Sequence, residues 1–270
     1  MSNIICLLTD FGYSDPFVGI MRGVILGINP KAKILDLAHG IPKFDVRHAA
    51  FILRIAYKYF PEGTVFCVVV DPGVGTERRS IVIKTRNYFF VGPDNGCLMW
   101  AAEDNGIIDI VEIANKRYML KEISTTFHGR DIFAPIAAHI SKGLDLGDIG
   151  PKLSVEALAK IKLREPIISE DMYVAEVITA DGFGNIFLHM KSELLEEQIG
   201  EKLIIQFGDK KVEAEIAQTY GDVPEGKFLI LKESSHGFLE IAMNRGSATR
   251  ILGVSPGETI KILRGKLDNT

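Results

Sequence analysis

The chain has 270 residues and a formal net charge of −4, from 31 Lys plus Arg against 35 Asp plus Glu. Its 47% hydrophobic and 24% charged residues are ordinary for a globular protein, which excludes a disordered or fibrous chain. The length suits one large domain or two smaller ones. Because a surface that grips phosphate backbones is normally basic, nucleic acid is disfavoured as a partner.

The cysteines and the apolar runs indicate the compartment. Cys6, Cys67 and Cys97 show neither the spacing of a zinc site nor a disulfide framework, so we expect a reducing, cytoplasmic setting. The first residues lack a basic segment and reach Asp10 early, unlike a signal peptide. The longest apolar stretch, residues 65–70, is far too short to span a bilayer, and no membrane partner is expected.

The first part of the chain alternates strand and helix patterns. Residues 4–9 form a continuous apolar run, which predicts a strand buried on both faces. Asp15 followed by Pro16 predicts the N-cap and first residue of a helix. That helix should bury one apolar face, made of Phe17, Ile20, Met21, Val24 and Ile25.

The alternation continues along the chain. Residues 33–37 predict a second strand, Asp45 the cap of a second helix, and residues 64–70 a third strand. Further strands are expected at residues 80–85 and 88–91, and further helices at residues 96–103 and 132–141. This order is typical of a mostly parallel sheet with flanking helices, so residues 1–165 are predicted to be an α/β domain.

The pattern changes after a predicted linker at residues 162–171, which contains a proline and mixed charges. Short runs rich in Ile, Val, Leu and Phe follow, separated by Gly, Asp and Asn, with few helical windows. They lie at residues 173–180, 186–190, 203–207, 212–217, 228–232, 238–242 and 259–263. Residues 172–270 are therefore predicted to form a smaller all-β domain, a barrel or a sandwich.

Two carboxylates follow strands of the predicted parallel sheet. Ligands of such sheets bind beyond the carboxyl ends of the strands, where Asp10 and Asp71 should lie. Either residue could instead stabilise a turn, and position alone supports both interpretations equally. No glycine-rich phosphate motif follows a strand. A carboxylate accepts hydrogen bonds from both hydroxyls of a ribose, so Asp10 favours a nucleoside over a nucleotide.

Other polar loops carry weaker signals. His128, taken alone, is better explained as a helix-entry residue, and no histidines have metal-ligand spacing, so neither metal nor cofactor is predicted. Asp181 and Asn185 bracket a glycine-rich segment that is typical of a hairpin turn. The aromatic residues Phe183, Phe187 and Phe238 are most often core residues, although at a domain edge their rings could stack on a purine.

Six loop motifs, taken together and in order, resemble one family. They read LLTDFGYSDPFVG, VVVDPGVGTERRS, VGPDNG, TFHGRDIFAP, DGFGN and SSHGFLEIAMNRGSA. This set is similar to the S-adenosylmethionine (SAM) hydroxide adenosyltransferases, which are SAM hydrolases related to the SAM-dependent fluorinase and chlorinase. The resemblance implies an α/β domain and a β-barrel, with SAM as substrate. It also implies a homotrimer in which the barrel closes the site of a neighbouring subunit.

The resemblance implies a catalytic triad of Asp71, Arg78 and His128, with Arg79 as the neighbouring candidate for the arginine. The halogenating relatives carry a tyrosine at the position of Asp71 and a halide-binding serine at the position of Gly129. The sequence is therefore similar to the hydrolases. The implied reaction is metal-independent attack of water on ribose C5′, giving adenosine and L-methionine. A SAM-dependent halogenase or a non-catalytic adenosine- or SAM-binding protein stays as the alternative.

Ligand-binding roles are implied in the same way. Asp10 would hold the ribose hydroxyls, Phe44 would line the site, and Asp15 and Asp181 would lie near the methionine ammonium group. The shorter spacing from Asp181 to Phe183 than in the fluorinase leaves the role of Asp181 open.

The remaining implied contacts come from the second domain. Asn185 and Phe187 would frame the adenine or methionine end, and Ser235 would meet the methionine carboxylate. The loop from Glu240 to Ser247, which includes Met243, would offer backbone groups to the adenine edge. His236 stands where the halogenases have an arginine.

Overall fold

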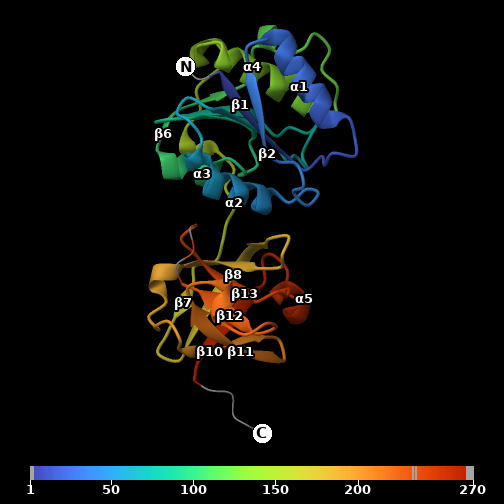
Figure 1. The fold of residues 1–270 in the computed structure, drawn as a ribbon. Helices are drawn as coiled ribbons and strands as arrows, with labels where there is room; N and C mark the ends of the chain where they lie inside the picture. Colours follow the sequence, from blue (N-terminus) through green and yellow to red (C-terminus); the bar gives the residue numbers. More distant parts are fainter. Residues whose placement is uncertain (1–2, 233, 235, 266–270) are drawn as a thin grey trace. The chain divides into compact units, whose positions relative to one another are not determined.

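The computed structural model describes residues 3–232, 234 and 236–265, and the chain divides into two compact units, Met1–Ile161 and Lys162–Thr270 (Figure 1). Among the described residues, the first unit has a six-stranded sheet in the order β2-β1-β3-β5-β4-β6. Its strands are β1 (Ile4–Thr9), β2 (Lys33–Ala38), β3 (Val65–Val69), β4 (Ser80–Thr85), β5 (Phe89–Pro93) and β6 (Ile107–Glu112).

Pairing within this sheet is mostly parallel. Strand β1 pairs in parallel with β2 and β3, and β3 pairs in parallel with β5, whereas β4 runs antiparallel to both β5 and β6. This confirms the predicted α/β class. Strand β6 was not predicted from the sequence, because it is a short, half-exposed edge strand that directly follows a helix and has no clear alternation.

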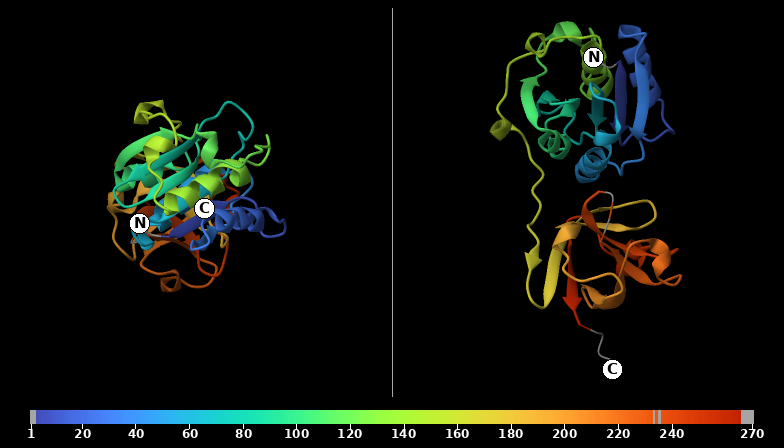
Figure 2. Two further views of the ribbon diagram at one scale, coloured as in Figure 1. Left: turned by 90° about the horizontal axis from the view of Figure 1, so that it is seen from above. Right: turned by 60° about the vertical axis from the view of Figure 1, so that its left-hand side comes forward.

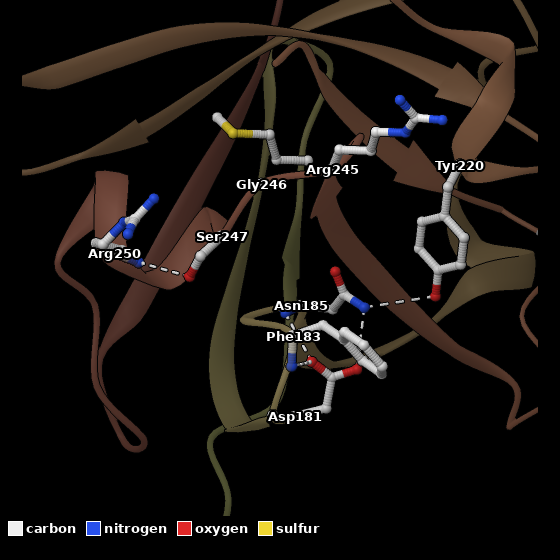
Figure 3. A pocket seen from close by; sticks show the side chains of 10 residues that line it. Asp181, Phe183, Asn185, Tyr220, Arg245, Gly246, Ser247 and Arg250 are labelled. Atoms are coloured by element: carbon white, nitrogen blue, oxygen red, sulfur yellow. Dashed lines mark hydrogen bonds between the residues drawn. The ribbon is translucent and has the colours of Figure 1, made fainter. Parts of the chain in front are cut away.

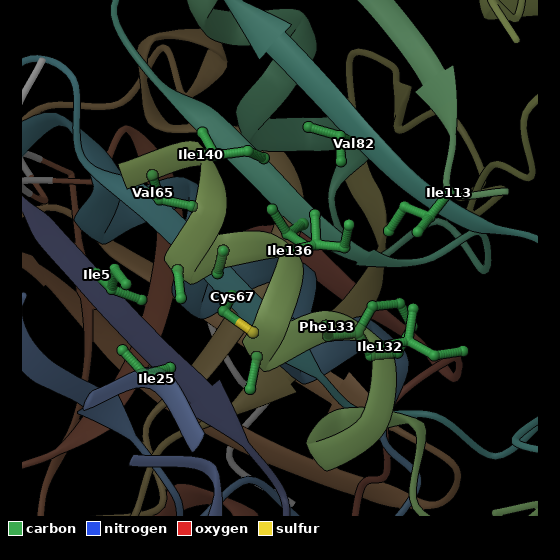
Figure 4. Close-up of a cluster of buried hydrophobic side chains, with 14 of the residues drawn as sticks. Ile5, Ile25, Val65, Cys67, Val82, Ile113, Ile132, Phe133, Ile136 and Ile140 are labelled. Carbon is green, nitrogen blue, oxygen red and sulfur yellow. The ribbon is translucent and has the colours of Figure 1, made fainter. Parts of the chain in front are cut away.

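Helices cover both faces of the sheet (Figures 1 and 2). They are α1 (Phe17–Ile28), α2 (Val46–Ala56), α3 (Met99–Asn105) and α4 (Ala134–Ser141). One buried cluster joins α1 and α4 to the side chains of Ile5, Val65 and Cys67, as Figure 4 shows. A second buried cluster joins α2 and α3 to the alternate side chains of the same strands, including Cys6 and Phe66. Burial on both faces explains the continuous apolar strands.

The start of α1 differs from the prediction. Pro16, not Asp15, occupies the N-cap position, and no side chain caps the helix. Asp15 is exposed and precedes the cap. Phe17 and Ile20 are 40% and 37% exposed, so the buried face is narrower than the predicted one. The buried residues of α1 are Val18, Met21 and Ile25. By contrast, Asp45 caps α2 as predicted, accepting a 2.8 Å hydrogen bond from the backbone N–H of His48.

The second unit is a β-barrel. Its strands are β7 (Ile167–Ile168), β8 (Met172–Ala180), β9 (Ile186–Lys191), β10 (Lys202–Phe207), β11 (Lys210–Ala217), β12 (Phe228–Leu231), β13 (Phe238–Met243) and β14 (Thr259–Arg264). The order β14-β10-β11-β12-β13-β9-β8 closes through pairing of β14 with β8. Strand β7 pairs with β8 outside this closed ring and lies inside the predicted linker. A helix, α5 (Ala248–Leu252), follows β13, and the predicted barrel is confirmed.

The cysteines are free and buried, and burial raises the pKa of Cys6 to about 12. The cytoplasmic setting stays a prediction. Among the described residues, no helix combines the length and apolarity that crossing a membrane requires. The same part of the chain contains no cluster of three or more His, Cys, Asp or Glu side chains placed to hold a metal ion.

Candidate active site

A pocket of about 350 Å³ lies beyond the carboxyl ends of β1 and β3 in the first unit. It brings together four of the predicted site residues, Asp10, Phe44, Asp71 and His128, although they are far apart in the sequence. Asp10 directly follows β1, and Asp71 lies two residues beyond the end of β3, which confirms that the two carboxylates share one edge of the sheet. The other lining residues are Phe11, Lys43, Val69, Val74, Thr126, Phe127 and Gly129.

Asp71 and Arg78 form a paired, nearly buried contact. The Arg78 Nε donates to Asp71 Oδ1 at 2.9 Å and to Oδ2 at 3.0 Å, and Arg78 Nη2 also donates to Oδ2. The side chain of Arg78 is only 10% exposed and that of Asp71 only 5%. Such fork-shaped pairing of guanidinium with carboxylate fixes the relative orientation of both groups.

The same guanidinium contacts His128. Arg78 Nη2 lies 2.8 Å from His128 Nδ1, and because a guanidinium only donates, Nδ1 must accept. The imidazole is therefore neutral, with its proton on Nε2. Burial lowers the pKa of His128, and the positive charge of Arg78 lowers it further. These effects outweigh the opposing charges of Asp71 and Asp131 and a hydrogen bond with the Ser124 backbone, so the imidazole stays neutral to a lower pH than that of an ordinary histidine.

Two more contacts hold the Arg78 side chain. Its Nη1 donates to Ser80 Oγ at 2.8 Å, and its guanidinium carbon lies 5.3 Å from the centre of the Phe133 ring. The neighbouring Arg79 pairs instead with Asp94, at 2.9 Å. Of the two candidate arginines, Arg78 is thus the one that joins Asp71 to His128.

Asp10 and Phe44, which both line the pocket, also contact each other. The buried Asp10 carboxylate accepts a 2.8 Å hydrogen bond from the backbone N–H of Phe44, and the Lys43 ammonium donates to the Asp10 carbonyl oxygen. Phe44 has a φ of 66°, in a region that aromatic residues rarely occupy, and its side chain is 68% exposed. The hydrogen bond to Asp10 helps to hold the strained backbone at Phe44. It uses Asp10 Oδ2, and Oδ1 takes no part in this contact.

A buried polar network that we did not predict supports the loop after β1. Thr9 Oγ1 lies 2.7 Å from His39 Nδ1 and accepts from the Phe11 backbone N–H at 3.2 Å. His39 Nε2 lies 3.1 Å from Asp36 Oδ1. Burial alone would raise the pKa of Asp36, but hydrogen bonds from Arg22, His39 and Tyr13 outweigh it and lower that pKa. The position of His39 directly after β2 was the feature of the sequence that could have indicated this network.

The barrel has a pocket of its own, of about 700 Å³ (Figure 3). Three predicted residues line it, Asp181, Asn185 and Met243. Asp181 Oδ1 accepts from the backbone N–H groups of Phe183 and Asn185, both at 2.9 Å, and its Oδ2 accepts from Asn185 Nδ2 at 2.9 Å. The segment is thus a tight turn, as the glycine pattern predicted, and it also presents two polar side chains to a pocket.

Tyr220 extends this network and was missed in the sequence. Its hydroxyl donates to Glu240 Oε1 at 2.8 Å and lies 3.5 Å from Asn185 Nδ2. His236 Nε2 lies 3.1 Å from the other Glu240 oxygen. Burial raises the pKa of Tyr220, and its hydrogen bond to Glu240 raises it further, so the phenol stays a donor. A single tyrosine before a turn carries no pattern that would have identified it.

The remaining predicted residues lie elsewhere. Glu240 and Phe187 are buried in strands and do not line the barrel pocket, although the Phe187 ring packs edge-on against His236 at 4.9 Å. Asp15 is exposed and does not line the pocket of the first unit. Ser235 lies outside the described residues. The pocket is also lined by Phe183, a ring considered for stacking on a purine, and by Arg245 and Ser247, which belong to the predicted segment from Glu240 to Ser247; Arg250 was not predicted.

Known proteins share this sequence and fold. The chain is 38% identical to a protein of Salinispora tropica named (R)-S-adenosyl-L-methionine hydrolase, over 97% of this chain and 98% of the relative. It is 25% identical to a fluorinase of Nocardia brasiliensis, covering 97% of each. The crystal structure of an uncharacterized conserved protein from Thermotoga maritima is 42% identical and superposes with a TM-score of 0.89, over 96% of this chain and 100% of that one.

Two family profiles cover most of the sequence. The SAM hydroxide adenosyltransferase N-terminal domain matches residues 5–150, and the corresponding C-terminal domain matches residues 175–261. The first match contains Asp10, Asp71, Arg78 and His128, and the second contains the turn from Asp181 to Asn185. The chain belongs to the SAM hydroxide adenosyltransferase family.

Proposed function

We propose that this protein hydrolyses SAM to adenosine and L-methionine. The observation that carries the proposal is the hydrogen-bonded cluster of Asp71, Arg78 and His128, two members of which line one pocket with Asp10. The hydrolase name of the relative from Salinispora tropica, 38% identical over nearly the full length, supports the same substrate. That name specifies the (R) epimer, and we propose the same preference here.

The chemistry suits such a cluster. The oxygen of water forms a bond to ribose C5′ while the bond from C5′ to sulfur breaks, and the electron pair of that bond goes to sulfur. The sulfonium cation thereby becomes a neutral thioether, which needs no proton from a general acid. The only proton to remove comes from the attacking water. The enzyme must therefore orient one water molecule and accept one proton, and must hold the oxygen close to the carbon in line with sulfur.

We assign the proton to Asp71. His128 Nδ1 already accepts from Arg78, and Asp71 Oδ2 accepts from two Arg78 nitrogens, whereas Asp71 Oδ1 accepts only from Arg78 Nε and keeps a lone pair for the proton. Arg78 would stabilise negative charge that develops on the attacking oxygen, and the Nε2–H of His128 would orient that oxygen as a donor. A preorganised cluster with nearly buried side chains strengthens these electrostatic effects relative to bulk water.

Substrate binding divides between the two units. In the first, Asp10 would accept hydrogen bonds from the ribose hydroxyls through the oxygen that Phe44 does not occupy, and the exposed Phe44 ring would cover the nucleoside. In the second, we propose that Asp181, Asn185 and Met243 contact the ligand.

We also propose roles for Asp15, Ser235, Glu240 and Phe187. Asp15 and Ser235 are assigned to the methionine end by family resemblance alone. Glu240 and Phe187 would act through Tyr220 and His236, since neither lines the pocket.

We further propose a homotrimer in which the barrel of one subunit completes the site of a neighbour. The test is complementation between two inactive variants, Asp71→Asn in the first unit and Asn185→Ala in the second. Mixed subunits that exchange should regain activity, because some sites would then combine two intact halves. Absence of recovery in exchanged, folded oligomers would contradict a shared site, and sedimentation would report the subunit number.

The halogenase alternative is less well supported. A Cβ atom at Gly129 would lie 3.2 Å from Val69 Cγ1 and 3.4 Å from Met21 Sδ, so a serine there would require its neighbours to move. Identity to the fluorinase is also lower than to the hydrolases. Incubation with SAM and chloride tests the point, because 5′-chloro-5′-deoxyadenosine as the main product would reverse the assignment.

The direct experiment is incubation of the purified protein with SAM, followed by chromatography for adenosine and methionine. We expect equimolar release of both products and consumption of the (R) epimer from a mixed preparation. Use of SAM with chiral deuterium at C5′ should give inverted configuration, and retention would exclude a single displacement. Binding of adenosine without turnover would leave only a ligand-binding protein.

A further inference from the structure

The VGPDNG motif has no role in the reaction described so far, yet it contacts both ends of the catalytic loop. We define this loop as residues 71–79, from Asp71 to Arg79. Motif residues Asp94 and Asn95 lie at the end of β5, in the turn before α3. Neither Asp94 nor Asn95 lines the pocket beyond β1 and β3.

Asn95 holds the beginning of the catalytic loop. Its Nδ2 donates a 2.8 Å hydrogen bond to the backbone carbonyl of Val70, the residue directly before Asp71. Its Oδ1 accepts from the backbone N–H of Cys97 at 3.1 Å, which fixes the orientation of the amide. The carbonyl of the buried Val70 is thereby tied to a turn that comes later in the sequence.

Asp94 holds the end of the same loop. Its backbone N–H donates to the carbonyl of Arg79 at 2.9 Å, and its carboxylate pairs with the Arg79 guanidinium at 2.9 Å. The other carboxylate oxygen accepts from the backbone N–H of Ala159 at 2.9 Å, and Arg79 also donates to the carbonyl of Ala157. The Asp94 side chain is only 5% exposed, so its surroundings restrict it to one orientation.

The turn that carries both residues is itself rigidly placed. Gly96 has a φ of +95°, and a Cβ there would lie 2.9 Å from Ile161 Cγ1. A Cβ at Gly92 would lie 2.5 Å from the carbonyl oxygen of Val68 in β3. These close approaches fix the turn against β3 and against the end of the first unit.

We propose that Asp94 and Asn95 are positioning residues that set the separation of Asp71 and Arg78, an inference that rests on the proposed hydrolysis. Adjacent residues of one turn hold the neighbour of Asp71 and the neighbour of Arg78. The paired contact between Asp71 and Arg78 requires both ends of the loop to stay in register. Small displacements of reacting groups are costly, at about 100-fold in rate for 1 Å.

The test replaces the side-chain NH₂ group of Asn95 by an oxygen atom. Asn95→Asp keeps the acceptor for the Cys97 N–H but removes the donor to the Val70 carbonyl. We expect kcat for adenosine release to fall about 10- to 100-fold. The KM for SAM and the Kd for adenosine should change less than about twofold, because neither residue lines the pocket.

The chain offers a matched control. Asn115 Nδ2 donates to the carbonyl of Asp148 at 2.8 Å, and its Oδ1 accepts from the backbone N–H of Arg117 at 3.1 Å. The exposed Asn115 thus repeats the hydrogen-bond pattern of Asn95 without holding the catalytic loop. Asn115→Asp should leave kcat unchanged.

The outcomes separate this inference from the proposed function. A wild-type protein that releases no adenosine overturns the hydrolysis itself and the inference with it. An active wild type, with equal kcat in Asn95→Asp and Asn115→Asp, overturns the positioning role alone. If Asn95→Asp lowers the unfolding midpoint but leaves kcat per folded molecule unchanged, the positioning role is likewise overturned. If Asn95→Asp does not fold, Asp94→Asn retains the acceptor for the Ala159 N–H and should lower kcat in the same way.

Discussion

The two units hold their polar groups in different ways. In the first unit, Arg78 and His128 belong to separate loops beyond the sheet, and their contact joins residues far apart in the sequence. In the barrel, Asp181 and Asn185 belong to one tight turn, and Tyr220 and Glu240 connect that turn to a wall strand. The geometry of a contact between two loops changes when either loop moves. A turn that is fixed by its own backbone hydrogen bonds keeps its geometry when a neighbouring side chain is replaced.

This difference predicts where substitutions act. In the first unit, replacing a polar side chain should alter reaction rate more than stability, since the sheet and its two apolar clusters do not depend on the loops. In the barrel, the buried Glu240 carboxylate belongs to the wall itself. Removing one of its partners should therefore alter stability as well as binding.

The largest effect is expected for Asp71→Asn. The new amide places an N–H₂ group against the Arg78 guanidinium and removes the proposed proton acceptor, so kcat should fall about 10²- to 10⁴-fold. His128→Ala should have an effect in the same range while the protein stays folded. Asp109→Asn, at a surface pair with Lys152, is the control. Chromatographic assay of adenosine gives the rates, and wild-type rates in both site variants would refute the triad.

A smaller effect is expected for Asp10→Ala. Loss of one charge-assisted hydrogen bond to the ribose, which contributes about 1.5–3 kcal/mol, should weaken adenosine binding about 10- to 100-fold. Asp15→Ala should leave adenosine binding unchanged, because adenosine lacks the methionine part to which Asp15 is assigned. Calorimetry measures both affinities, and an unchanged Kd in Asp10→Ala would remove that residue from the site.

Tyr220→Phe tests the barrel side of the comparison. The change leaves the nearly buried Glu240 carboxylate without one hydrogen-bond donor, and we expect the free energy of unfolding to fall by about 1–3 kcal/mol. Tyr59→Phe, at a position 71% exposed, should have no measurable effect. Urea unfolding followed by circular dichroism supplies the numbers. A stability equal to wild type would mean that Glu240 relies on its other partner.

The smallest effect concerns pH. Burial and the charge of Arg78 lower the pKa of His128, and a lowered pKa extends the neutral form to lower pH. Activity that requires neutral His128 should therefore persist below the usual histidine value of about 6.5 and decline only in more acidic solution. The pH profile of kcat/KM, with NMR titration of the imidazole, measures this. If the acidic limb of this profile had an apparent pKa at or above 6.5, the result would contradict the tautomer assigned from the contact with Arg78.

Sequence patterns were sufficient for the order of most elements and for the edge of the sheet where the pocket with Asp10 and Asp71 lies. Apolar runs identified β1 and β3 because burial on both faces leaves no polar positions. The edge strand β6 and the start of α1 were missed or misplaced, because partial exposure weakens the pattern that burial creates. The position after a strand made Asp71 a candidate alongside a turn-forming role, whereas Arg78 and His128 were suggested only through family resemblance.

What the sequence determined by itself was the alternation of hydrophobic runs and turn residues, since each depends on neighbours along the chain. It thereby determined an α/β unit followed by a barrel. Only the tertiary structure decided that Arg78 rather than Arg79 reaches His128, that Tyr220 meets Glu240, and that Asn95 holds the residue before Asp71. These contacts join residues that are separated in sequence, so they depend on how strands pair and loops meet, which no local pattern encodes.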